Sequence, residues 1–186
     1  MEKKRCAWST SDALYIKYHD EEWGAPSYDD DYLFEMICLE GQQAGLSWIT
    51  ILKKRENYRR LFAGFNAESI ANFSDDYLEQ ILLDKGIIRN RLKVFAIRKN
   101  AIAFLKIQKE QGSFSSYIWS FVGGKPITNN FESMGDLPAK TSLSIQMSKQ
   151  LKKYGFTFVG PTICYAFMQA SGMVNDHTKD CYKYHQ

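Results

Sequence analysis

Four possible metal ligands stand near the two ends of the chain. Cys6 and His19 lie near the start, and His177 and Cys181 lie near the finish. Two cysteines and two histidines are a set that binds zinc tetrahedrally and leaves no open position for a substrate. The spacing of His177 and Cys181 suits one helical turn, although Cys6 and His19 are further apart than in standard zinc fingers. Each residue alone is commonly an ordinary buried side chain, but together they predict one structural zinc ion per chain.

A carboxylate stands among apolar residues in a predicted helix over residues 31–44. Glu40 falls on the same helical face as Leu33, Ile37 and Ala44. An unpaired charge on such a face is costly, so either a structural ion pair or a bound ligand must compensate it. Both interpretations remain open on these residues alone. Aromatic side chains that a ligand pocket could use lie in the N-terminal segment: Trp8, Tyr15, Tyr18 and Trp23.

The third candidate is a predicted helix over 75–83, capped by Ser74, followed by a turn and a second helix over 88–106. Gly86 can adopt a positive φ in the turn, and the backbone amides that begin the second helix can hold a phosphate. Residues 85–109 include no acid and eight bases: Lys85, Arg89, Arg91, Lys93, Arg98, Lys99, Lys106 and Lys109. A solvated charged face is the plain alternative. The glycine turn favours a helix-hairpin-helix over about 75–106 that contacts the DNA backbone through Gly86, Arg89 and Arg91.

The elements that must position these residues are helical nearly throughout. Apolar spacing predicts helices over 31–44, 48–62, 75–83, 88–106, 142–153 and 161–171, and no segment alternates as a strand does. A chain of 186 residues with 45% hydrophobic content can bury one good core. The sequence therefore predicts a single all-α domain over residues 1–186.

Composition narrows the compartment and the class of protein. The formal net charge of +3 is too small to indicate nucleic acid by itself. No apolar stretch is long enough for a signal peptide or a membrane span, so we expect a cytoplasmic protein without membrane association. Its cysteines should then be reduced thiols or metal ligands. Cys38 and Cys164 fall in apolar helices and are predicted to be core residues, whereas His185 is expected in the C-terminal tail.

Several long segments resemble the 3-methyladenine DNA glycosylase I family of alkylation-repair enzymes, and together they span nearly the whole chain. The segments are YHDEEWG at 18–24, LFEMICLEGQQAGLSWITILKKRENYR at 33–59, GIIRNRLK at 86–93, WSFV at 119–122, KYGFTFVGPTICYAFMQASG at 153–172 and VNDH at 174–177. The resemblance implies a helix-hairpin-helix glycosylase fold whose termini are joined by a structural zinc. It also implies the absence of the catalytic aspartate found in related glycosylases, and between Lys85 and Phe131 the only acid is Glu110.

The same resemblance implies the activity and the roles of individual residues. Glu40 would read an extruded 3-methyladenine, with Trp8, Tyr18 and Trp48 around the base and Tyr15 and Trp23 completing the pocket. Gly45 and Leu46 would lie at the gap left in the DNA. The expected enzyme is a monomer without an organic cofactor. It hydrolyses the N-glycosidic bond in double-stranded DNA containing alkylated bases and leaves an abasic site.

Three other functions are compatible with parts of the pattern. A zinc-stapled DNA-binding module would release no base from alkylated DNA. A helix-hairpin-helix glycosylase-lyase of another specificity would form an adduct that borohydride traps, although no lysine matches such a nucleophile. A small-molecule hydrolase with an aromatic pocket is disfavoured by the acid-free basic segment.

Overall fold

The computed structural model describes residues 3–9 and 11–184, most of which lie in helices. His185 lies outside the described residues. The α-helices are α1 (Ala13–Glu21), α2 (Asp30–Gln43), α3 (Trp48–Leu61), α4 (Ala67–Ala71), α5 (Asp75–Ile81), α6 (Arg91–Gln111), α7 (Phe114–Trp119), α8 (Ser142–Tyr154) and α9 (Pro161–Ala170). Short 3-10 helices are η1 (Ala7–Ser9), η2 (Ala63–Phe65), η3 (Ser120–Val122) and η4 (Met134–Asp136).

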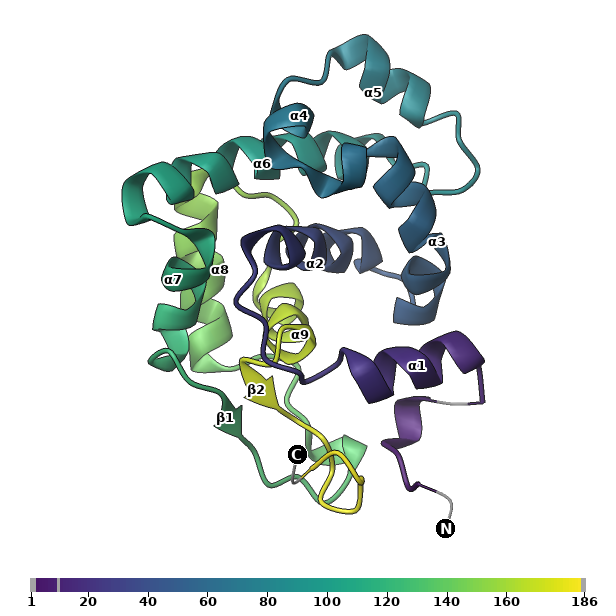
Figure 1. The fold of residues 1–186 in the computed structure, drawn as a ribbon, viewed down its shortest axis with the longest axis vertical. Helices are drawn as coiled ribbons and strands as arrows, with labels where there is room; N and C mark the ends of the chain where they lie inside the picture. The colour runs from purple at the N-terminus through teal and green to yellow at the C-terminus, as the bar shows by residue number, and fades with distance from the viewer. Residues whose placement is uncertain (1–2, 10, 185–186) are drawn as a thin grey trace.

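Helix α2 occupies the centre of the molecule, and the other helices surround it (Figure 1). All ten of its residues from Leu33 to Gln42 are buried. It packs against α3, α6, α7 and α9. A helix covered on every side buries any polar group it carries, so a carboxylate near its C-terminal end cannot reach bulk water as a surface carboxylate does.

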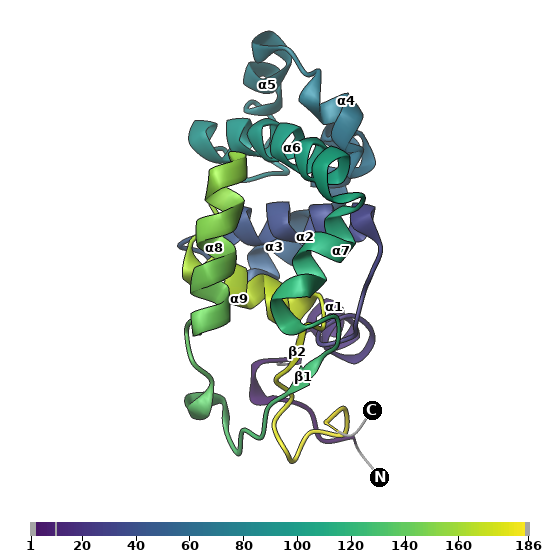
Figure 2. The same ribbon diagram turned by 90° about the vertical axis from the view of Figure 1, so that its left-hand side faces the viewer.

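Figures 1 and 2 place α4, α5 and α6 at one end of the molecule, and both chain termini at the other. At the first end, α4 packs closely on α6, and α5 also contacts α6. Side-chain caps begin these helices: Ser74 accepts from the backbone N–H of Tyr77, as expected, and Asn90 accepts from that of Lys93. At the other end, the N–H of Tyr182 donates to the carbonyl of Lys4 at 2.9 Å, which joins the two ends of the chain.

The prediction of a mostly helical single domain is confirmed, with three corrections. A small parallel sheet pairs β1 (Ile127–Thr128) with β2 (Val174–Asn175), strands too short to show alternation. Helices α1, α4 and α7 were not predicted, because each is short and has little apolar periodicity of its own. Helix α6 begins at Arg91 rather than at residue 88 and continues to Gln111, where Gly112 adopts φ 86° and ends it. Among the described residues, no helix is long and apolar enough to cross a membrane.

Candidate functional site

A cavity of about 160 Å³ lies between the N-terminal segment, α2, the start of α3 and α9. All six residues expected in a base pocket line it: Trp8, Tyr15, Tyr18, Trp23, Glu40 and Trp48. Sequence reasoning missed three further lining residues, Gln43, Ala166 and Gln169. They lie within the segments that carry the family resemblance, but an amide or an alanine has no residue-type signal that distinguishes it from its neighbours.

Short local elements position the aromatic side chains of this cavity. Trp8 belongs to η1, and the carboxylate of Asp12 begins α1 by accepting the N–H of Leu14 at 3.0 Å. Tyr15 and Tyr18 are three residues apart on α1, so both point to one side of the helix. Trp48 is the first residue of α3, directly after the turn that leaves α2.

The aromatic rings contact one another, so contacts within the protein hold the walls of the cavity in place. The ring centres of Trp8 and Trp23 are 4.9 Å apart at 69°, and those of Trp8 and Tyr15 are 4.8 Å apart at 54°. On the other side, Tyr18 and Trp48 are 5.5 Å apart. Preformed aromatic faces suit a flat ring, and their electron-rich surfaces favour a cationic one.

The cavity also holds polar atoms that nothing in the protein satisfies. Among the residues that the structure describes, three buried side-chain nitrogen or oxygen atoms lack a hydrogen-bond partner: Trp8 Nε1, Glu40 Oε2 and Trp48 Nε1. All three residues line this one cavity. Buried polar groups are normally paired, because leaving one unpaired costs about 1–3 kcal/mol. The site is therefore built for a ligand that accepts from indole N–H groups and pairs with a carboxyl group.

Burial controls the ionisation of the Glu40 carboxyl group, because this residue is only 3% exposed. Desolvation raises the pKa of this carboxyl group to about 8. Within residues 3–9 and 11–184, no ion pair compensates Glu40, so the structural ion pair that the sequence left open is not found there. Burial, together with the neighbouring Glu40, also raises the pKa of Tyr18 well above its usual value. At neutral pH the empty pocket is thus mainly uncharged, and a cationic ligand would favour the carboxylate form of Glu40.

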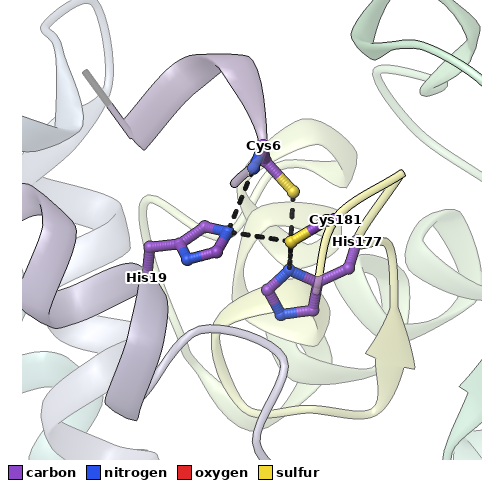
Figure 3. A group of neighbouring side chains, drawn as sticks. All are labelled: Cys6, His19, His177 and Cys181. Carbon is purple, nitrogen blue, oxygen red and sulfur yellow. Dashed lines mark hydrogen bonds between the residues drawn. The ribbon is translucent and has the colours of Figure 1, made fainter. Parts of the chain in front are cut away.

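The four predicted metal ligands meet at one buried point (Figure 3). Their ligand atoms all lie within 4.8 Å of one another. Cys6 Sγ is 3.4 Å from His177 Nδ1, and Cys181 Sγ is 3.4 Å from His19 Nε2 and 3.5 Å from His177 Nδ1. Zinc–ligand bonds of about 2.0–2.3 Å in a tetrahedron separate the ligand atoms by about 3.3–3.8 Å, and the three contacts between sulfur and nitrogen match that spacing.

Contacts behind the ligands hold both imidazole rings in suitable orientations. His19 Nδ1 lies 2.9 Å from Asp20 Oδ1, and His177 Nε2 lies 3.0 Å from the carbonyl oxygen of Trp23. Each ring therefore donates at one nitrogen and turns the other toward the thiols, which is the usual arrangement of metal-binding histidines. The helical turn expected between His177 and Cys181 is wrong, because this segment is a non-helical turn after β2.

The turn between α2 and α3 is exposed and follows a residue that lines the cavity. Gly45 adopts φ 79°, a conformation that favours glycine, and no heavy atom lies within 4 Å of an added Cβ. The side chain of Leu46 follows it and is 40% exposed. Gln43, at the end of α2, lines the cavity. An apolar side chain thus stands at the surface a few residues from the pocket wall.

The turn between α5 and α6 differs from the expectation for Gly86, which does not adopt a positive φ. A Cβ at this position would lie 2.6 Å from the side chain of Asn57 and 2.8 Å from Asp84 Oδ1. The N–H of Gly86 donates to that same carboxylate oxygen at 2.6 Å. A larger residue here would have to displace the ends of these two side chains, so the glycine is favoured by their close approach and not by its backbone angles.

The eight basic residues of segment 85–109 are not one free surface. Arg91 pairs with Glu79 at 2.6 Å, and Arg98 pairs with Asp75 at 2.6 Å, so both join α6 to α5. Lys93 is buried and points into the protein. Arg89, in contrast, is exposed before the start of α6, and no hydrogen bond or ion pair within the described residues engages its side chain.

Comparisons with known proteins agree on one family. The methyladenine glycosylase family model matches residues 8–184. The chain is 52% identical over 178 residues to DNA-3-methyladenine glycosylase 1 of Escherichia coli strain K12, covering 96% of this chain and 95% of that protein. It is 51% identical over 177 residues to DNA-3-methyladenine glycosylase of Haemophilus influenzae, covering 95% and 96% respectively.

Solved structures give the same result. A crystal structure of 3-methyladenine DNA glycosylase I superposes with a TM-score of 0.95 at 52% identity, covering 97% of this chain and 99% of the other. A variant of 3-methyladenine DNA glycosylase I in complex with 3-methyladenine superposes with a TM-score of 0.93 at 40% identity, covering 96% of each chain. The resemblance found in the sequence is confirmed, and this chain belongs to the methyladenine glycosylase family, as a glycosylase of the DNA-3-methyladenine type I group.

Proposed function

We propose that this protein removes 3-methyladenine from alkylated double-stranded DNA by hydrolysing the N-glycosidic bond, leaving an abasic site. The observation that carries the proposal is the aromatic cavity in which Trp8 Nε1, Trp48 Nε1 and Glu40 Oε2 are all buried without a hydrogen-bond partner in the described part of the chain. Adenine bases have ring nitrogens that accept from indole N–H groups and an amino group that donates to a carboxylate. A structure with 3-methyladenine bound is known for a relative, which supports the choice of base.

Glu40 acts in this proposal by recognising the base. Methylation at N3 makes adenine cationic in DNA, and the positive ring would lie between aromatic faces such as those of Tyr18 and Trp48. Its charge and its amino group both favour the carboxylate form of Glu40, although burial raises the pKa of that group to about 8 in the empty pocket. The pocket thus favours a base that brings a positive charge, and Tyr15 and Trp23 would complete the enclosure.

The chemical step needs little help from the protein, because the leaving base departs neutral from a bond that alkylation has already weakened. Glycoside hydrolases usually employ two carboxyl groups. Of the described residues that line this cavity, Glu40 alone carries one. A water molecule would attack the sugar carbon as the base leaves, and the released base would remain held by Glu40 and the aromatic rings. Bases with more stable glycosidic bonds, such as 7-methylguanine, should be released poorly.

Reaching a stacked base requires its extrusion from the helix, which costs a few kcal/mol. We infer that α5 and α6 form a helix-hairpin-helix over about residues 75–106 that contacts phosphates near Gly86, Arg89 and Arg91. Such contacts orient the DNA without reading its sequence. Gly45 and Leu46 would lie at the gap left by the base. We propose that the protein acts as a monomer, and we expect it in the cytoplasm because the similar proteins are bacterial DNA glycosylases.

We further propose that the cluster of Cys6, His19, His177 and Cys181 holds one zinc ion. The bound ion would stabilise the fold by joining the two ends of the chain, and four protein ligands leave no position for a substrate. It would thereby hold η1 and α1, and with them Trp8 and Tyr18, against the central helix. The zinc ion would thus have a structural role, and it would support the pocket without lining it.

The decisive experiment measures base release from methylated duplex DNA by chromatography of the free bases. The wild type should release 3-methyladenine and little 7-methylguanine. Glu40→Gln should lower the rate by about 10²-fold or less, because one or two hydrogen bonds are lost. Glu68→Gln is a matched control, since Glu68 is exposed on α4 far from the cavity lining. Absence of base release would favour a non-catalytic DNA-binding module, and an adduct trapped by borohydride would favour a glycosylase-lyase.

A further inference from the structure

Lys93 is a basic residue of segment 85–109 that the proposed DNA contacts do not use. It is the third residue of α6, and the residue is only 6% exposed. Its ammonium group donates to the carbonyl oxygen of Gln42 at 2.8 Å and to that of Ala44 at 2.6 Å. Both carbonyl groups belong to the C-terminal end of α2. A lysine is almost never buried unless its charge is satisfied, and here the partners are backbone dipoles.

A network of further hydrogen bonds joins the same two places. The side-chain amide of Gln42 donates to the carbonyl oxygen of Lys93 at 3.0 Å, which returns the contact from α2 to α6. The hydroxyl of Tyr58 donates to Gln42 Oε1 at 3.1 Å and accepts the N–H of Ile88 at 3.1 Å. The end of α2 is therefore bonded to the start of α6 and to the turn that precedes it.

The two ends of this network face different parts of the proposed reaction. On one side, α2 carries Glu40 near its C-terminal end and continues directly into the exposed turn that contains Gly45 and Leu46. On the other side, the turn before α6 contains Gly86 and the exposed side chain of Arg89. Lys93 thus connects the start of α6 directly to the carbonyl group of Ala44, and Lys93 does not line the cavity.

We propose that Lys93 is a positioning residue for base extrusion: it holds the end of α2 against the start of α6, so that segment 44–47 enters the DNA where the hairpin has placed it. The proposal rests on the proposed function, because it assigns Lys93 a role in extruding the alkylated base. It does not make Lys93 part of the base pocket, whose lining excludes it. Loss of the ammonium group should therefore affect extrusion more than binding of the free base.

The test compares Lys93→Met, which keeps the apolar stem and removes the donors, with Lys149→Met, an exposed lysine on α8. Each variant is assayed for single-turnover excision from methylated duplex DNA and for affinity toward free 3-methyladenine. A duplex with 2-aminopurine beside a tetrahydrofuran abasic-site analogue reports local unstacking through its fluorescence. For Lys93→Met we expect excision to slow at least about tenfold, with a smaller 2-aminopurine response and with free-base affinity within about threefold of the wild type.

Two results would overturn the role of Lys93. One is excision and a 2-aminopurine response equal to those of Lys149→Met. The other is a parallel loss of excision and free-base affinity, which indicates general damage to the fold. If Lys93→Met does not fold, Tyr58→Phe removes the hydroxyl that bridges Ile88 and Gln42, and it should reduce the same two signals in the same direction. A wild type that releases no 3-methyladenine refutes the proposed function instead, whereas the 2-aminopurine comparison still tests Lys93.

Discussion

Glu40→Gln should stabilise the empty protein in a manner that depends on pH. The carboxyl group has an ordinary pKa of 4.5, and burial raises its pKa in the folded protein to about 8. Below pH 4.5 the group is protonated in both states and contributes nothing. As the pH rises toward 8, the unfolded chain ionises Glu40 while the folded protein does not, so the free energy of unfolding falls. Above pH 8 the ionisation of Glu40 causes little further fall in the free energy of unfolding.

The expected size of the effect follows from the same values. Each pH unit between the two pKa values corresponds to about 1.4 kcal/mol, so pH 5 and pH 8 differ by roughly 4 kcal/mol. Glutamine does not ionise, so residue 40 of the variant causes no fall in the free energy of unfolding as the pH rises. The difference in free energy of unfolding between variant and wild type should grow by that amount from pH 5 to pH 8. For a domain of this size it corresponds to a relative increase in Tm of about 10 °C.

Thermal or urea unfolding of both proteins at the two pH values gives the comparison directly. Any titration of the Cys and His cluster is common to both proteins and cancels in the difference. Glu68→Gln, at an exposed position on α4, should show no comparable growth with pH. An equal stability difference at pH 5 and pH 8 for Glu40→Gln would refute the reasoning, because it would mean that the pocket solvates the carboxylate as water does.

The remaining predictions concern metal, DNA and base. Elemental analysis should find one zinc per chain, and Cys181→Ala should lower both metal content and Tm; protein that is folded and free of metal would contradict the site. Arg89→Glu should weaken binding to duplex DNA of any sequence and reduce the salt slope of log affinity by about 1, and an unchanged slope would remove Arg89 from the DNA contacts. Trp48→Ala should weaken binding of free 3-methyladenine by about 1–3 kcal/mol, which fluorescence titration can measure, and unaltered affinity would exclude stacking on this ring.

Residue types and local spacing were sufficient to predict the helical domain and to single out Glu40 and the N-terminal aromatic residues, whereas the family resemblance supplied Trp48 and the assignment to a base pocket. Ser74 is a capping residue wherever its neighbours form a helix, and it caps α5 as predicted. A carboxylate amid apolar residues at position 40 already required compensation, whichever partner supplied it. Two cysteines and two histidines already formed a chemically complete ligand set, although their spacing could not show that they meet.

Local sequence patterns predicted the environment of a side chain least well where that environment depended on residues distant in the chain. Nothing in the sequence around Lys93 distinguishes it from an exposed lysine. It is buried because the end of α2 packs against it. Arg91 is expected to contact DNA, and only the fold shows that it also pairs with Glu79 of α5. Gly86 was expected to adopt a positive φ in the turn, but it does not, and the side chains of Asn57 and Asp84 lie close to it instead. Each of these features depends on a contact across the fold.

The sequence by itself therefore determined the chemistry that is available: aromatic faces, one carboxylate in an apolar segment and a set of soft metal ligands. These properties belong to the residues and follow them into any fold. The tertiary structure decided which of those groups lack a partner, and it selected Glu40, Trp8 and Trp48. Whether a polar atom is satisfied depends on every element packed around it, because hydrogen bonds and desolvation act over a few ångströms between segments that are far apart in the chain.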